Sequence, residues 1–84
     1  MTTWQVALVR EQGVEFGIIL VRDSVVDSPS ERDDLCRFWT VQLGRPVALL
    51  GERHFRSYGR KDIVAWLENV HPAQLPWRQM TLAA

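Results

Sequence analysis

The sequence has very little of what disulfide-bonded, membrane-spanning or secreted proteins need. Cys36 is the only cysteine, so no internal disulfide can form and no set of cysteines is available to hold a metal ion. The longest apolar run, 16–21, is far shorter than the roughly 20 residues that span a bilayer. The first residues carry neither a basic start nor a long apolar stretch, so no signal peptide is expected. We therefore expect a cytoplasmic protein in a reducing compartment, with no membrane partner.

Lysine is almost absent as well, and neither sign of charge predominates. Of the 10 basic residues only Lys61 is a lysine, a bias that is typical of GC-rich genes and indicates a bacterial source. The formal net charge is zero, with a slight acidic excess before residue 50 and a slight basic excess after it. Nucleic-acid-binding domains usually carry a strongly basic face, so the charge does not favour a nucleic-acid partner.

What remains is the composition of one ordinary folded domain. The chain has 84 residues, 46% of them hydrophobic and 24% charged, which is typical of a globular protein rather than a disordered one. A chain shorter than roughly 100 residues rarely splits into two domains, so residues 1–84 are expected to form a single small domain. Its four tryptophans supply large apolar surfaces to a small core or to an interface.

Hydrophobic patterning and turn residues predict the element order β-β-α-β-α-β. The first two strands are separated by a short turn and should pair antiparallel. The predicted strands are 4–9, 16–21, 47–50 and 77–82, the last at an edge of the sheet, and the predicted helices are 29–43 and 61–71. The sequence thus predicts an α+β fold, in which a four-stranded mixed sheet is packed with two amphipathic helices.

The first helix has the clearest ends. Ser28 and Glu31 have the spacing of a capping box, in which the Ser28 hydroxyl accepts from the Glu31 amide, and Pro29 takes the first helical position. Gly44 can adopt the left-handed closing conformation, and Pro46 prevents continuation. Because this helix connects the second and third strands, those strands should be parallel in a right-handed crossover.

The second predicted strand is apolar on both faces, which is typical of a central strand covered on both sides. Two short helices cover one face of a sheet comfortably. Either they lie on opposite faces, each leaving part of the sheet bare, or a partner covers one face. Since a large exposed apolar patch marks an interface, we expect a homodimer. Trp4 and Trp77, on the first and last strands, are the expected interface residues, with core positions as the alternative.

The main candidate for a ligand site is the Arg/aromatic loop 51–61. Ligands tend to bind beyond the carboxyl ends of parallel strands, and this loop follows the third strand, opposite the acidic segment 22–27. Arginine suits phosphate or carboxylate, and aromatic rings can stack on a base. The candidate anion- or ligand-binding residues are Arg53, His54, Arg56, Tyr58, Arg60 and Lys61. The alternative is a solvated loop whose arginines pair with Asp23, Asp27, Glu52 or Asp62.

Signals for catalysis are weak, and no catalytic residue, cofactor or metal ligand is predicted. The Walker, G-x-G-x-x-G and G-x-S-x-G patterns are all absent. Acids beside a histidine can hold a divalent metal, so a metal-dependent hydrolase using Asp23, Glu52 and His54 is kept as a remote hypothesis. Cys36 is expected to be a small buried thiol, and His71 a structural residue that complements the dipole at a helix end.

These observations favour a small non-enzymatic protein-interaction module, homodimeric through an apolar sheet face. The alternative is a binder of an anionic ligand or nucleic acid through loop 51–61. The two hypotheses use different surfaces, so the placement of Trp4, Trp77 and the basic loop decides between them.

Overall fold

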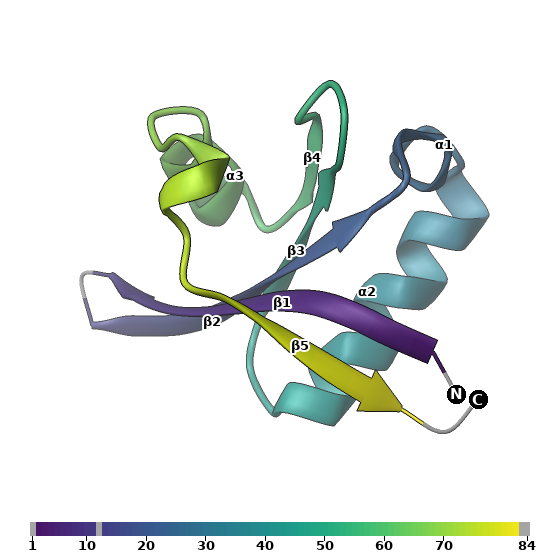
Figure 1. Cartoon of the computed structure of the whole chain (residues 1–84), viewed down its shortest axis with the longest axis horizontal. Helices are drawn as coiled ribbons and strands as arrows, with labels where there is room; N and C mark the ends of the chain where they lie inside the picture. The colour runs from purple at the N-terminus through teal and green to yellow at the C-terminus, as the bar shows by residue number, and fades with distance from the viewer. Residues whose placement is uncertain (1, 12, 83–84) are drawn as a thin grey trace.

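The computed structural model describes residues 2–11 and 13–82, which form a five-stranded mixed sheet flanked by helices (Figure 1). The strands are β1 (Thr2–Glu11), β2 (Val14–Val21), β3 (Val47–Gly51), β4 (Ser57–Gly59) and β5 (Trp77–Leu82). The helices are α1 (Asp23–Val26), α2 (Pro29–Leu43), α3 (Lys61–Leu67) and a short 3-10 helix, η1 (Pro72–Gln74). The predicted α+β class is therefore confirmed, but these residues contain five strands rather than four and three α-helices rather than two.

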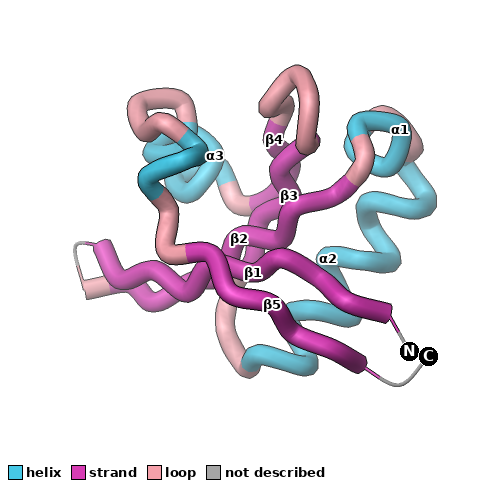
Figure 2. Tube along the Cα trace, in the orientation of Figure 1, coloured by secondary structure: helices cyan, strands magenta, loops and turns pink. Residues whose placement is uncertain are grey.

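The strand order across the sheet is β4-β3-β2-β1-β5 (Figure 2). β1 and β2 form an antiparallel hairpin, and β2 and β3 are parallel with α2 between them, both as predicted. β5 lies at one edge, also as predicted, and pairs antiparallel with β1. In this pairing Trp77 lies opposite Ala7, and Met80 lies opposite Trp4.

Besides η1, the sequence did not predict two further elements, α1 and β4, and both are short. α1 has four residues, too few to show a helical period. β4 has three residues in a segment expected to be a loop, and it pairs antiparallel with β3. Gly59, at φ 155°, closes β4 so tightly that a Cβ atom there would lie 2.9 Å from the Cα atom of Ala48. Because glycine has no side chain, the backbone of β4 can approach β3 this closely, although a glycine usually weakens a strand.

The helix ends agree only in part with the prediction. α2 has the predicted bounds, and Gly44 closes it at φ 65°. The capping box is wrong, because the Ser28 side chain makes no capping hydrogen bond. α3 ends at Leu67 instead of residue 71, and the Asn69 side-chain amide donates to the Ala65 carbonyl at 3.1 Å. Such a side-chain bond competes with the backbone bonds that would continue a helix.

His71 lies at the start of η1 and not at the end of α3. Its Nδ1 accepts the N–H of Ala73 at 3.1 Å, so it caps a helix N-terminus. The expectation that it complements the dipole at a helix C-terminus is therefore wrong, although its role is structural as expected. None of the helices among the described residues is long and apolar enough to cross a membrane.

The sheet has a separate apolar core on each face, which accounts for the doubly apolar β2. On one face, Phe16 and Ile18 pack with Ile63 and Leu67 of α3. The other face contributes a core that contains Ile19, Val21 and Val47 under Trp39 of α2. Figure 1 shows α2 and α3 on opposite sides of the sheet. The sequence left two explanations for a strand that is apolar on both faces, and the structure shows the first: the helices lie on opposite faces of the sheet.

Aromatic rings occupy both cores. Trp39 is fully buried, and the Trp4 ring meets it edge to face at 5.6 Å between centroids. In the other core the rings of Phe16 and Trp66 meet in the same way at 5.3 Å. Edge-to-face contacts of this kind add roughly 0.5–1.5 kcal/mol beyond the burial of the rings.

Candidate functional site

The loops that follow β2 and β3 lie side by side, as expected for the carboxyl ends of two parallel strands. Asp23, at the start of α1, has a side chain that is only 16% exposed. Its carboxylate accepts the backbone N–H groups of Arg53 and His54, each at 3.2 Å, and contacts Nδ1 of the His54 ring. A Cβ atom on Gly51 would collide with this carboxylate. The glycine therefore lets Asp23 reach the loop after β3.

These hydrogen bonds set the charge of Asp23. Partial burial by itself would raise its pKa, but hydrogen bonds from the His54 ring and from the amides of Arg53 and His54 outweigh that effect, so the pKa is lowered. The carboxylate is accordingly ionised at neutral pH, and its oxygens are occupied by donors of the loop. This arrangement suits an anchor for the loop better than a catalytic base.

Two further acids bind side chains of the same loop, at positions 56 and 58. Asp27 pairs with the Arg56 guanidinium at 2.6 Å. Asp33 of α2 accepts the hydroxyl of Tyr58, and the guanidinium of Arg32 lies 4.3 Å from the centre of that ring. The hydrogen bond to Asp33 is the main cause that raises the pKa of Tyr58. The segment that contains α1 and the start of α2 thus fastens the side of the β3–β4 connection that faces it.

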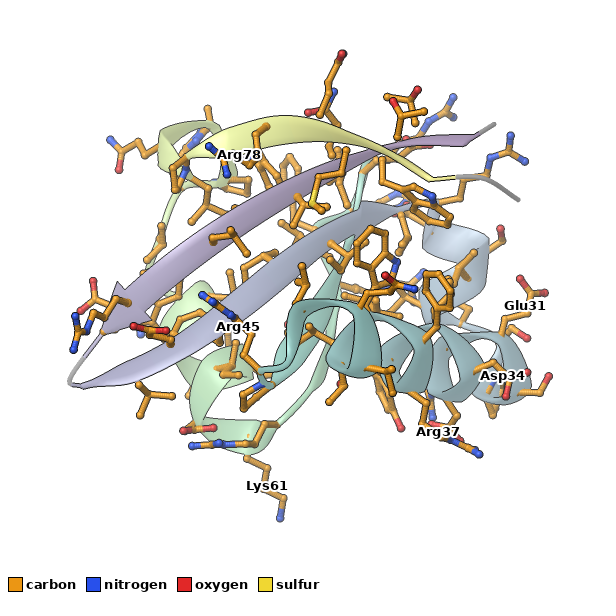
Figure 3. The ribbon with its side chains drawn as sticks, turned by 90° about the horizontal axis from the view of Figure 1, so that it is seen from below. Glu31, Asp34, Arg37, Arg45, Lys61 and Arg78 are labelled. Atoms are coloured by element: carbon orange, nitrogen blue, oxygen red, sulfur yellow. The ribbon has the colours of Figure 1, made fainter. Side chains whose placement is uncertain are left out.

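The remaining predicted ligand residues lie further along the chain. Arg60 precedes α3 and forms a bidentate pair with Asp62, with nitrogen–oxygen distances of 2.7 and 2.8 Å. This pair raises the pKa of Arg60 and lowers that of Asp62. Arg53 and Lys61 are exposed, and Figure 3 shows Lys61 projecting away from the fold. The pairing of arginines with acids is the arrangement expected of a solvated, structural loop.

The geometry also bears on the remote metal hypothesis. Within residues 2–11 and 13–82, no three His, Cys, Asp or Glu side chains come together as a possible metal site. Glu52 lines a shallow depression with Thr3 and Trp4 and does not join Asp23 and His54. The three residues named by the hypothesis are therefore not assembled.

Trp4 and Trp77 lie on opposite faces of the sheet. Trp4 is half-buried against the core under α2, whereas Trp77 is half-buried against the core under α3. The indole N–H of Trp77 donates to the Pro72 carbonyl at 2.8 Å, which fixes that ring to η1. A single sheet face therefore does not present both rings, so an interface through one face of the sheet, as the sequence suggested, can use only one of them.

An apolar surface that the sequence did not predict lies on the α2 side of the sheet. Phe38 is 43% exposed, and its ring meets Trp39 edge to face at 5.6 Å. Partly buried apolar side chains pack against the same core nearby. We call this set the α2–β5 surface: Trp4, Leu35, Phe38 and Met80. The signal missed was the position of Phe38, three residues after Leu35, on the flank of the helix.

Charged groups border that surface and extend along the outer side of α2, since Arg78 lies on β5 two residues from Met80 and on the same face of the sheet. Figure 3 shows Glu31, Asp34 and Arg37 projecting from the outer side of α2, and Arg78 on β5.

Cys36, also on α2, is half-buried. Its burial and, to a smaller extent, the charge of Asp33 raise its pKa. Cys36 is therefore less buried than expected, and its raised pKa makes it a poor nucleophile.

Comparison of the chain with known protein families, curated proteins and solved structures found no match. Two surfaces of the fold remain as candidates for a function. One is a basic loop held by acids of its own chain, and the other is an exposed aromatic surface beside an edge strand.

Proposed function

We propose that this protein is a small non-enzymatic interaction module that binds a protein partner through the α2–β5 surface. The observation that carries the proposal is the row of three rings formed by Trp4, Trp39 and Phe38. Trp39 is fully buried in the middle, and each outer ring meets it at 5.6 Å. Phe38, one of the outer rings, is 43% exposed, so a buried ring supports an aromatic group at the surface.

This arrangement supports binding because it reduces the entropy that association must lose. An exposed ring held by a buried neighbour has little rotamer freedom left, so less ordering is needed when a partner covers it. Aromatic residues and methionine are enriched in the centres of protein interfaces, where a few of them supply most of the binding energy. Trp4, Phe38 and Met80 are residues of these kinds.

Loop 51–61 is the weaker candidate. Its best anion donors, Arg56 and Arg60, are each held by a carboxylate at 2.6–2.7 Å, so an incoming anion would have to replace an existing pair. Exposed ion pairs of this kind contribute only about 0–1 kcal/mol each, so an anion could displace the carboxylates, and the loop stays as the second candidate. Binding of an anion or nucleic acid at Arg53, His54 and Lys61 would be steeply salt-dependent.

The test compares two exposed phenylalanines. Phe38 and Phe55 are 43% and 50% exposed, but Phe55 lies in loop 51–61. We expect Phe38→Ser to abolish association with the partner, whether a second copy or another protein, while Phe55→Ser leaves it unchanged. Sedimentation velocity and pull-down with purified wild type and variants measure this, and circular dichroism checks folding. Equal association by the two variants would contradict the proposal, and loss only in Phe55→Ser would favour the loop.

A further inference from the structure

We infer that the partner at the α2–β5 surface is a second copy of this chain, paired edge to edge along β5. This inference rests on the proposed function and names the partner of that surface. β5 is six residues long and, among residues 2–11 and 13–82, is paired on one side only, with β1. The opposite edge of the described sheet, β4, has three residues, half the length of β5. β5 therefore offers the longer row of free backbone groups.

The direction of those groups follows from one hydrogen bond at the start of β5. The N–H of Trp77 donates to the Leu75 carbonyl at 2.8 Å and not to its partner on β1. In an antiparallel ladder the N–H and C=O of one residue point to the same side, and the side alternates along the strand. Gln79 and Thr81 therefore point their backbone groups outward with Trp77, whereas Met80 points its own toward β1.

The hydrogen bonds on the far side of the sheet agree with this assignment. The carbonyl of Val21 accepts the N–H of Glu52 at 2.9 Å, so odd-numbered residues of β2 face β3 and even-numbered ones face β1. Even residues of β2 pair with odd residues of β1, which leaves the even residues of β1 facing β5. Trp4 is one of these, and its partner is Met80, as the alternation along β5 requires.

The edge also lacks the usual features that prevent strand pairing. Proteins protect free edges with proline, with several charged residues, or with bulges. β5 contains no proline, and its one charged residue is Arg78. Antiparallel pairing centred on Gln79 places Arg78 opposite the partner's Met80, and pairing centred on Met80 places it opposite the partner's Leu82. Parallel in-register pairing would instead bring the two arginines together, which is unfavourable.

A two-fold axis perpendicular to the sheet then brings the same face of both copies to the same side. The α2–β5 surface of one copy adjoins that of the other, so Met80 meets the partner's Met80 when the pairing is centred on Met80, and the partner's Arg78 when it is centred on Gln79. On the other face, Gln79 and Thr81 are exposed polar residues that stay in contact with water. The formal net charge of the chain is zero, so two copies have no overall repulsion to overcome.

The test removes one outward N–H group. Gln79→Pro deletes a donor that the fold does not use, and proline is tolerated on edge strands whose N–H faces solvent. Gln79→Ala is the matched control, because it changes the side chain and keeps the N–H. We expect wild type and Gln79→Ala to form dimers in sedimentation velocity, and Gln79→Pro to dimerise at least tenfold more weakly.

Hydrogen exchange on the wild type gives the same answer without a variant, in case Gln79→Pro fails to fold. The amides of Gln79 and Thr81 should exchange quickly in dilute samples and slowly in concentrated ones, while the amide of Met80 is protected in both. Fast exchange of Gln79 and Thr81 at every concentration overturns pairing along β5.

The outcomes separate this inference from the proposed function. A Gln79→Pro variant that dimerises like the wild type, together with a monomeric Phe38→Ser, overturns the β5 pairing and leaves the α2–β5 surface as the interface. A wild type that stays monomeric at several hundred micromolar overturns the second copy as partner. In that case the pull-down with Phe38→Ser and Phe55→Ser still decides whether the surface binds another protein.

Discussion

The carboxylate of Asp23 lies in the space that a side chain at Gly51 would occupy. β3 runs directly into the loop that Asp23 holds through the amides of Arg53 and His54. A larger residue at the end of the strand would push the acid away from these donors. The glycine and the aspartate therefore act as a pair that sets the path of the chain after β3.

Gly51→Ala should destabilise the protein by roughly 1–3 kcal/mol, the usual cost of overpacking a tight site. Most of this cost should disappear in the Asp23→Ala background, because the colliding carboxylate is then absent. Urea denaturation of the two single variants and the double variant measures the coupling. An equal cost of Gly51→Ala in both backgrounds would show that the two residues do not share this space.

Stability should fall in acid, partly through Asp23. Its folded-state pKa is lowered, so its contribution is fully present above the unfolded value of about 3.9 and is lost as the pH falls through the folded-state pKa. The lowered pKa of Asp62 acts in the same direction. Asp23→Asn should therefore lose less Tm than the wild type between pH 7 and pH 3. Parallel Tm curves for the two proteins would remove Asp23 from this account.

Two glycines with positive φ should respond differently to alanine. A Cβ atom on Gly59 would lie 2.9 Å from both the Ala48 Cα atom and the Val47 carbonyl oxygen, whereas nothing lies within 4 Å of one on Gly13. Gly13→Ala should cost roughly 1–2 kcal/mol, the price of the left-handed conformation alone. Gly59→Ala adds a collision with backbone atoms that cannot move aside, so its loss of stability in urea should be clearly larger. A smaller loss at Gly59 would mean that β4 does not pack against β3 as described.

Trp39 should be the most sensitive residue of the core under α2. It is fully buried and contacts both Trp4 and Phe38, so Trp39→Ala should cost about 3–5 kcal/mol, enough to unfold a domain of this size. Trp39→Phe should be milder, since its indole nitrogen is buried with no hydrogen-bond partner among the described residues. Thermal denaturation followed by circular dichroism distinguishes the two substitutions, and equal losses of Tm would contradict this reading.

Cys36 should react slowly with thiol reagents in the folded protein. Burial and the neighbouring Asp33 raise its pKa, so less of the thiolate is present at a given pH than in an unfolded chain. We expect the rate of reaction with Ellman's reagent at pH 8 to lie well below that of the same protein in denaturant. Equal rates would indicate an accessible, reactive thiol.

Periodic patterns predicted the long elements of the fold because each one buries a face. The apolar runs of β1 and β2 and the left-handed glycine after α2 are local signals, and the crossover between β2 and β3 then follows from connectivity. The doubly apolar β2 correctly indicated a sheet covered on both sides. What the pattern could not decide was whether the second cover was a helix of the same chain or a partner.

The elements and contacts that were missed depend on residues far apart in the sequence. β4 exists because Gly59 fits against Ala48, and the shape of loop 51–61 depends on acids from the segment around α1. Similarly, the separation of Trp4 from Trp77 onto two faces follows from the register of β5 against β1. A shift of β5 by one residue would move Trp77 to the face that carries Trp4, and no local signal in the sequence fixes the register.

The pairing of β1 with β5 has a consequence for how the protein folds. Ala7 and Trp77 are partners 70 positions apart (77 − 7), whereas the β1–β2 hairpin joins neighbouring segments. Contacts that close long loops lose more chain entropy before they form, and folding rates fall as such contacts increase. β5 is therefore expected to dock late, onto a hairpin, helix and third strand that are already in place. Until it docks, the edge of β1 is open, so a β5 from a neighbouring molecule can compete for it and produce a strand-exchanged dimer.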